Sequence, residues 1–342
     1  MRTSHDAPAQ QPVSSDEPLL EVDNLHVQFR TRDRTIHAVN GLSYSVGAGE
    51  ALAILGESGS GKSVSAQAVM GILDSPPAKI TAGTIRFRGD DLLTMSEQAR
   101  RRIRGRRIAM IFQDALTALN PVFTVGDQIG EMFRVHQGLS RSEAENRAVE
   151  LMDRVRIPSA RQRVRNYPHE FSGGMRQRVM IAMALALEPD VLVADEPTTA
   201  LDVTVQAQIM RLLADLQREL SMGLLLITHD LAVVADVADR IAVMYAGGLV
   251  EQSEVRELYE RPAHPYTEGL LASVPRLDRK DSMLAPISGA PPDLSRLPGG
   301  CAFHPRCARA RARCRSEEPE LREVDGGRLS ACHFAAEVLD GR

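Results

Sequence analysis

Aromatic residues are scarce in this chain of 342 residues. Tryptophan is absent, and Phe, Tyr and Trp together make up 4% of the sequence, which argues against a sugar- or base-stacking surface built from many rings. Long apolar runs are missing too. The longest, Val179–Leu187, falls far short of the roughly 20 residues that a membrane-spanning helix needs. If the protein serves a membrane, other chains must supply the spans.

A surplus of basic residues is also lacking. Lys and Arg number 41 against 45 Asp and Glu, a net charge of −4, so the composition does not favour nucleic-acid binding. Residues 1–17 lack the apolar core of a secretory signal. They are rich in Pro, Ser, Gln and Asp, which predicts a disordered N-terminus. The overall content of 43% hydrophobic and 25% charged residues is that of a soluble globular protein.

Apolar patterning predicts an α/β core with a mostly parallel sheet, because short buried strands alternate with helical stretches. After residue 255, Pro becomes frequent and the periodicity fades. We therefore expect a core at 18–255 and a Pro- and Arg-rich extension at 256–342. The predicted strands are 19–29, 36–46, 51–55, 84–88, 108–112, 191–194 and 224–228, and the predicted helices are 62–69, 124–188 with breaks at 158 and 167–168, and 203–220.

A phosphate-binding loop follows the apolar strand at 51–55. Its residues fit the pattern G-x-x-x-x-G-K-[ST] between a strand and a helix, which is the context this motif requires. Backbone N–H groups of such a loop surround phosphate oxygens, Lys62 contacts the β- and γ-phosphates, and the Ser63 hydroxyl ligates Mg²⁺. The loop consists of Gly56, Glu57, Ser58, Gly59, Ser60, Gly61, Lys62 and Ser63.

Two adjacent acids, Asp195 and Glu196, end the predicted strand at 191–194. An acid in this place can hold Mg²⁺ through water, and its neighbour can polarise an attacking water. Together with the loop at 56–63, the pair indicates a nucleoside triphosphatase.

The segment 171–175, FSGGM, resembles the LSGGQ signature of ATP-binding-cassette proteins, with Phe171 and Met175 as departures. The other sequence motifs of that family occur here in the same order. Gln113 stands where its Q-loop glutamine does, residues 200–202 resemble the D-loop, and His229 stands where the switch histidine does.

The resemblance implies a role for each residue. Glu196 orients the hydrolytic water, Asp195 holds Mg²⁺, Gln113 senses Mg²⁺ and couples to membrane subunits, and His229 holds the γ-phosphate. Two cassettes sandwich two ATP molecules head to tail, and the signature of one completes the ATP site of the other. The signature residues are Ser172, Gly173, Gly174 and Met175. For the aromatic ring that stacks on adenine, Phe29 is a candidate, although Arg32 and Arg34 occupy the stretch where that ring is often found.

Three segments narrow the resemblance to ATPases of dipeptide and oligopeptide permeases: 112–121, 167–178 and the HPYT of 264–267. Membership implies a peripheral protein on the cytoplasmic face of the cell membrane. Its partners would be a second ATPase, two transmembrane permease subunits and, indirectly, an extracytoplasmic peptide-binding protein. Alternatives are a soluble cassette ATPase acting on nucleic acid or ribosomes, an exporter ATPase, and an importer ATPase for nickel or glutathione.

Six arginines fall between residues 100 and 107. Such a run is usually a solvated face, and without aromatic partners or a wider basic surface it does not predict nucleic-acid binding. Its place just before Gln113 suggests proximity to acidic lipid headgroups.

All four cysteines lie in the extension, interleaved with arginines. Disulfides are disfavoured in a reducing cytosol, whereas four thiolates suit structural zinc or an iron–sulfur cluster. The gaps between the cysteines are wider than those of usual zinc sites, and positive charge would offset a cluster with four thiolate ligands. Resemblance to peptide-permease ATPases that carry a 4Fe–4S cluster favours the cluster, with zinc or no metal as alternatives. The candidate ligands are Cys301, Cys307, Cys314 and Cys332.

Overall fold

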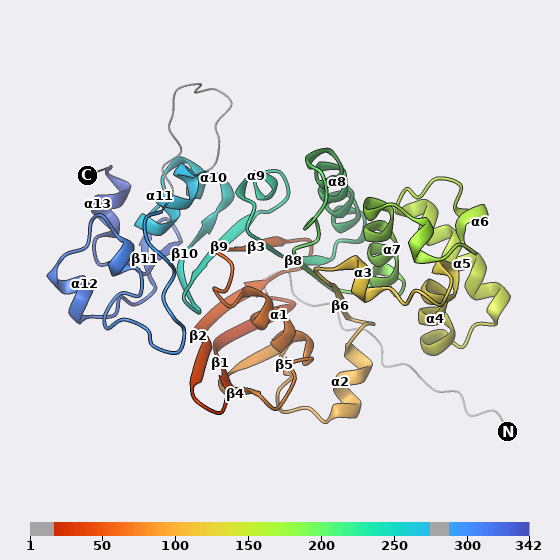
Figure 1. The fold of residues 1–342 in the computed structure, drawn as a ribbon, viewed down its shortest axis with the longest axis horizontal. Helices are drawn as coiled ribbons and strands as arrows, with labels where there is room; N and C mark the ends of the chain where they lie inside the picture. The colour runs from red at the N-terminus through yellow and green to blue at the C-terminus, as the bar shows by residue number, and fades with distance from the viewer. Residues whose placement is uncertain (1–16, 274–286, 342) are drawn as a thin grey trace.

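The computed structural model describes residues 17–273 and 287–341, so the predicted disordered N-terminus lies outside the described residues except for Glu17. Two sheets form the centre of the molecule (Figure 1). The smaller is antiparallel, in the order β2-β1-β4-β5. Its strands are β1 (Leu20–Arg30), β2 (Thr35–Val46), β4 (Ala78–Phe87) and β5 (Asp90–Asp91).

The larger sheet has eight strands in the order β11-β12-β10-β9-β3-β8-β7-β6. Strands β9, β3, β8, β7 and β6 run parallel, and β10, β12 and β11 continue the sheet antiparallel. Every residue of β3, β7 and β8 is buried, as continuously apolar parallel strands require. The strands are β3 (Ala51–Leu55), β6 (Ile108–Ile111), β7 (Val191–Asp195), β8 (Gly223–Thr228), β9 (Arg240–Tyr245), β10 (Gly248–Glu254), β11 (Arg322–Asp325) and β12 (Arg328–Ser330).

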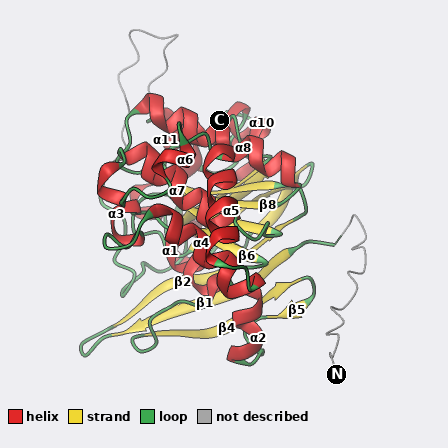
Figure 2. Cartoon of the chain, turned by 90° about the vertical axis from the view of Figure 1, so that its right-hand side faces the viewer, coloured by secondary structure: helices red, strands yellow, loops and turns green. Residues whose placement is uncertain are grey.

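Helices cover both faces of the larger sheet. Helix α1 packs between the two sheets, where Ala66 and Val69 join one apolar core. A second core lies on the other face and includes Phe133, Leu151 and Ile181 from the helical part of the chain. Figure 2 shows the small sheet below these stacked helices. The helices before residue 240 are α1 (Lys62–Met70), α2 (Glu97–Ile103), α3 (Ala115–Ala118), α4 (Val125–Gln137), α5 (Arg141–Arg154), α6 (Ala160–Arg163), η1 (Pro168–Glu170), α7 (Gly173–Leu185), α8 (Val203–Leu220) and α9 (Leu231–Val234).

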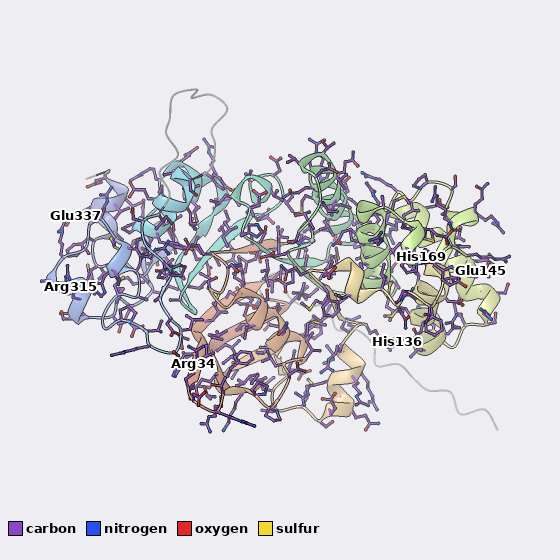
Figure 3. The ribbon with its side chains drawn as sticks, viewed as in Figure 1. Arg34, His136, Glu145, His169, Arg315 and Glu337 are labelled. Carbon is purple, nitrogen blue, oxygen red and sulfur yellow. The ribbon has the colours of Figure 1, made fainter. Side chains whose placement is uncertain are left out.

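The C-terminal extension joins the core sheet directly. Strand β12 pairs with β10, with Glu251 opposite Ser330, and Arg315 and Glu337 mark this end of the molecule, opposite His136 and Glu145 of the helical part (Figure 3). The division at residue 255 stays a prediction, since the extension shares a sheet with the core. Its helices are α10 (Val255–Glu260), α11 (Pro265–Ala272), η2 (His304–Arg306), α12 (Ala312–Ser316) and α13 (Ala335–Leu339).

The predicted strands and helices are confirmed, and the helix at 203–220 has the predicted bounds. Five strands of the described residues were not predicted: β5, β9, β10, β11 and β12. The strand expected at 84–88 begins earlier, at Ala78. Across the described parts of the chain, no helix combines the length and apolarity needed to cross a bilayer.

Candidate active site

The phosphate loop connects β3 to α1, and its glycines are required by close backbone packing. Gly61 has φ +102°, and a Cβ added there would lie 2.1 Å from the carbonyl oxygen of Ala38. Gly56 is equally confined, because its Cβ would lie 2.2 Å from the Met244 carbonyl oxygen. Ser58 and Gly59, at the tip of the loop, are exposed. The loop therefore keeps its curled backbone and offers an open rim at the N-terminus of α1.

Lys62 lies buried beneath this loop. Its Nζ donates to the carbonyl oxygens of Gly56 at 2.8 Å and Glu57 at 2.9 Å, and Ser60 Oγ lies at 3.4 Å. Burial lowers the pKa of Lys62, and the nearby carboxylates, led by Glu196 and Asp195, oppose that shift. The ammonium group thus sits at the centre of the loop among acidic groups.

Ser63 and Asp195 meet across the ends of α1 and β7. The Ser63 hydroxyl donates to Asp195 Oδ1 at 2.9 Å, and Asp195 is 4% exposed. Burial raises the pKa of Asp195, whereas the Ser63 hydrogen bond lowers it. Two candidate metal ligands from separate motifs, the Ser63 hydroxyl and the Asp195 carboxylate, therefore lie side by side. Both offer oxygen atoms, the ligand type that Mg²⁺ prefers.

Glu196 is the point at which the predicted catalytic residues converge. Gln113 Nε2 donates to its Oε2 at 2.8 Å, and His229 Nδ1 lies 3.2 Å from its Oε1. The Thr199 hydroxyl also donates to Oε2, at 2.9 Å, a contact that the sequence did not predict. Glu196 has φ +45°, a left-handed conformation that is uncommon outside glycine and is found at functional sites.

The signature segment stands at the start of α7. Ser172 caps this helix by accepting from the Met175 N–H, and Ser172 and Gly173 are exposed. In Figure 1, α7 lies to the right of α1. The structure thus brings Gln113, Glu196 and His229 together and leaves the signature open to solvent elsewhere on the same chain.

Known proteins match this chain over nearly its whole length. Residues 39–199 match the ABC transporter family, and residues 250–314 match the oligopeptide/dipeptide transporter C-terminal region. A protein named as a peptide import ATP-binding protein from Brucella abortus (strain 2308) is 52% identical, with 93% of this chain and 97% of that protein covered. The dipeptide transport ATP-binding protein DppD of Bacillus subtilis (strain 168) is 53% identical over 85% of this chain and 87% of its own length.

Solved structures agree with the fold. A dimeric ATP-binding cassette in a post-hydrolysis state, bound to ADP and phosphate, is 27% identical with a TM-score of 0.62, and the match covers 69% of this chain and 99% of the cassette. The chain belongs to the ATP-binding-cassette family. It is therefore an ABC transporter ATPase, and ATP is its nucleotide.

The stretch of this ABC ATPase in which an adenine-stacking ring is often found lies partly beside the extension. Phe29 is half-buried and packs against the core between the sheets. Arg34 pairs with Asp293 at 3.4 Å, and the His37 N–H donates to the Leu294 carbonyl oxygen at 3.0 Å. The extension thus runs along the β1–β2 hairpin, a neighbour that the sequence did not predict.

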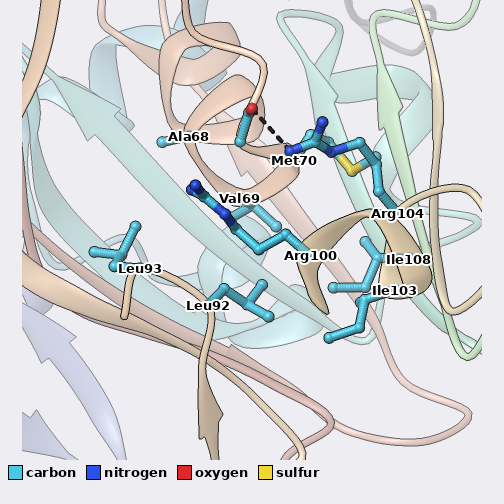
Figure 4. Close-up of a pocket in the computed structure, with 10 residues that line it drawn as sticks. Ala68, Val69, Met70, Leu92, Leu93, Arg100, Ile103, Arg104 and Ile108 are labelled. Atoms are coloured by element: carbon cyan, nitrogen blue, oxygen red, sulfur yellow. Dashed lines mark hydrogen bonds between the residues drawn. The ribbon is translucent and has the colours of Figure 1, made fainter. Parts of the chain in front are cut away.

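The arginine run of the ABC ATPase is partly neutralised within the chain. Arg100 and Arg101 pair with Glu97, and Arg107 pairs with Asp190 at 2.6 Å. Figure 4 shows Arg100 and Arg104 over a pocket with apolar walls, where Arg104 donates to the Gly71 carbonyl oxygen. These contacts leave less free positive charge for lipid headgroups than the sequence suggests.

The four cysteines of the ABC ATPase line one cavity of about 280 Å³, with Arg309 and Arg311 also in its wall. All four are free thiols. The pKa of Cys332 is raised to about 11, mainly by burial and in part by the other three sulfurs, while the Phe334 N–H lowers it. Within the described residues, no three His, Cys, Asp or Glu side chains are close enough to hold one metal ion.

Proposed function

We propose that the chain is the ATP-hydrolysing subunit of a peptide importer and that Glu196 is its catalytic base. The observation that carries the proposal is the Glu196 carboxylate, which is held by Gln113, Thr199 and His229 at 2.8–3.2 Å. Three neighbours fix the orientation of the carboxylate, so it can accept a proton from a water placed in line with the γ-phosphate. Peptide as the transported solute rests on the relatives and on the matched C-terminal region.

The loop residues Gly56–Ser63 would bind the phosphates, with Lys62 turning from its carbonyl partners to the β- and γ-phosphate oxygens. Ser63, Asp195 and Gln113 offer the oxygen donors that suit Mg²⁺, which would neutralise charge on the phosphates. His229 is exposed, so its ring is free to contact the γ-phosphate. The exposed Ser172 and Gly173, with Gly174 and Met175, would complete the ATP site of a second cassette, as the dimeric form of the solved cassette supports.

An apolar surface beside Gln113 would receive the permease. Phe112, Val122 and Phe123 are 46%, 71% and 53% exposed, although large apolar side chains are normally buried. Exposed apolar side chains that gather on a surface mark interaction sites, and Phe112 directly precedes Gln113, the residue that contacts Glu196. Docking there would couple peptide transport to hydrolysis on the cytoplasmic face of the membrane.

For the cysteine cavity we propose a 4Fe–4S cluster rather than a zinc ion. The four cysteines line a cavity of about 280 Å³, which is larger than a single ion needs. They line this space together, and among the described residues no group of three His, Cys, Asp or Glu side chains is placed to hold a single ion. Arg309 and Arg311 in the cavity wall are paired with Glu268 and Glu337, and a cluster bound by Cys301, Cys307, Cys314 and Cys332 would hold the segment together.

The Glu196→Gln variant tests the catalytic proposal. Steady-state hydrolysis should fall by roughly 10²–10⁴-fold, the range that a general base contributes, while ATP binding persists and ATP-bound dimers accumulate in size-exclusion chromatography. Glu260→Gln, which alters an exposed pair with Arg256, is the matched control and should hydrolyse ATP normally. Wild-type turnover by Glu196→Gln would refute the assignment.

The transported solute is tested with the ATPase and its permease subunits in lipid vesicles. ATP-driven uptake of labelled di- and oligopeptides supports the proposal, whereas uptake of only nickel or glutathione would replace it.

Anaerobic purification tests the cluster. Brown protein that contains iron and sulfide, and that loses its colour in the Cys307→Ser variant, supports a cluster. Protein with stoichiometric zinc would favour the zinc alternative. Protein without metal, in which all four thiols can be alkylated, would exclude both.

A further inference from the structure

An acidic residue lies inside the phosphate loop, next to the place where a polyanionic nucleotide would bind. Glu57 is the second residue of the loop, and a carboxylate there repels phosphates unless another charge offsets it. Arg306, from the turn between Cys301 and Cys307, donates to Glu57 through both ends of its guanidinium, Nη1 to Oε2 at 2.6 Å and Nη2 to Oε1 at 2.9 Å. Bidentate pairs of this kind are strong and directional.

The Arg306–Glu57 pair is well sheltered from water. The Arg306 side chain is 5% exposed and that of Glu57 is 27% exposed. Arg306 also donates through Nε to the Ser288 carbonyl oxygen at 3.2 Å, and its guanidinium lies over the Tyr245 ring. The hydrogen bonds to Glu57 raise the pKa of Arg306 above its usual value, so the guanidinium keeps the positive charge that offsets Glu57.

A second residue of the extension holds the backbone of the same loop position. The Glu57 N–H donates to the Tyr266 hydroxyl at 3.0 Å. Tyr266 is fully buried and packs against Tyr245 and Phe303, with ring centroids 4.6 and 5.3 Å away. Glu57 is thus held through its side chain by Arg306, through its N–H by Tyr266, and through its carbonyl oxygen by Lys62.

We infer that Arg306 is a positioning residue of the nucleotide site, which neutralises Glu57 and fixes the phosphate loop from the cysteine segment. The inference rests on the proposed nucleotide site and adds a residue that none of its motifs contains. Arg306 belongs to a turn tied to the cysteines, because its N–H donates to the Phe303 carbonyl oxygen and the His304 N–H donates to that of Cys301. The cysteine segment therefore reaches the phosphate loop through one side chain.

The test is the ATP dissociation constant of the full-length protein, measured by titration for single and double variants. Arg306→Met should weaken ATP binding by about tenfold, or about 1.4 kcal/mol, because the unpaired Glu57 carboxylate then repels the phosphates. Adding Glu57→Gln should restore affinity, because the unpaired carboxylate that repels the phosphates is then gone. Arg306→Lys, which keeps the charge but loses the fork geometry, should fall between wild type and Arg306→Met.

Arg313→Met is the matched control, because Arg313 is in the same segment but pairs with Glu317; its affinity should not change. A merely structural role for Arg306 would leave the double variant as weak as Arg306→Met, and that result would overturn the inference, as would unchanged affinity in Arg306→Met. If Arg306→Met does not fold, Arg306→Lys with and without Glu57→Gln gives the same comparison. Lys62→Ala separates the two proposals: if it binds ATP normally, the nucleotide site itself is wrong.

Discussion

Replacing the buried Glu251 by Gln should change how the stability of the protein depends on pH. Glu251 lies on β10 and is 0% exposed, and its Oε1 accepts from the Ala263 N–H at 2.7 Å. Burial raises its pKa from 4.5 to about 7, although the nearby Thr267 hydroxyl, the hydrogen bond from the Ala263 N–H and the charge of Arg328 lower it. A Gln in this place keeps an acceptor for Ala263 and carries no titrating proton.

The sign follows from the two pKa values of Glu251. Between pH 4.5 and pH 7, the folded protein keeps a proton that the unfolded chain has lost, so the free energy of unfolding falls as pH rises through this window. The stabilising contribution is complete below pH 4.5 and lost above pH 7. At 1.36 kcal/mol for each pKa unit, the difference corresponds to about 3 kcal/mol. Relative to wild type, Glu251→Gln should therefore gain that much between pH 4.5 and pH 8.

His264, which is close to Glu251 in the extension, titrates in the opposite sense. Burial lowers its pKa from 6.5 to about 3. As the pH drops below 6.5, His264 is protonated in the unfolded chain but stays neutral in the folded protein, so the free energy of unfolding falls. Both proteins contain His264, and subtracting their unfolding free energies removes its contribution.

Urea unfolding at pH 5, 6, 7 and 8 measures the effect. Far-UV circular dichroism is the suitable signal, since the chain has no tryptophan. The stability of Glu251→Gln minus that of wild type should increase steadily with pH. A difference that stays constant from pH 5 to pH 8 would show that Glu251 is not held protonated in the fold.

Three further predictions concern the nucleotide site and its surroundings. Lys62→Ala should weaken ATP binding at least tenfold in a titration, because a charge at the phosphates is lost, whereas the exposed Lys79→Ala should not. Gly61→Ala should lower both the melting temperature and ATP binding, because the new Cβ would lie 2.1 Å from a carbonyl oxygen. Gly138 has open space around it, so Gly138→Ala should lower the free energy of unfolding by only about 1–2 kcal/mol. Phe123→Asp should abolish co-purification with the permease and leave ATP binding intact, and retained co-purification would place the docking surface elsewhere.

Local features were predictable because neighbouring residues determine them. The buried strands at 51–55 and 224–228 are short apolar runs, and the phosphate loop is a contiguous motif between a strand and a helix. The contact between Ser63 and Asp195 was also predictable in outline. Asp195 ends one parallel strand and Ser63 follows another, and the carboxyl ends of parallel strands lie along one edge of a sheet. The hydrogen bonds to Glu196 from Gln113 and His229 fit the same rule.

Contacts between distant segments were not predictable. Arg306 and Glu57 are 249 positions apart, and the arginine stands in a run of arginines in which nothing singles it out. The pairing of β12 with β10 was missed for a related reason: β12 has three residues, too few for an alternating pattern to be recognised. Thr199 has no motif of its own, and only the turn after Glu196 brings its hydroxyl to the carboxylate.

These long-range contacts indicate why the extension cannot be a freely attached appendage. Strand β12 covers the edge of β10, which would otherwise present unpaired backbone groups to other chains. The same extension supplies the guanidinium that neutralises an acid in the phosphate loop. A cassette without the extension would therefore face two separate costs, an open sheet edge beside the buried Glu251 and a free carboxylate where phosphates bind. Only the second is relieved by Glu57→Gln, so that substitution distinguishes the electrostatic part of the extension's contribution from its part in completing the sheet.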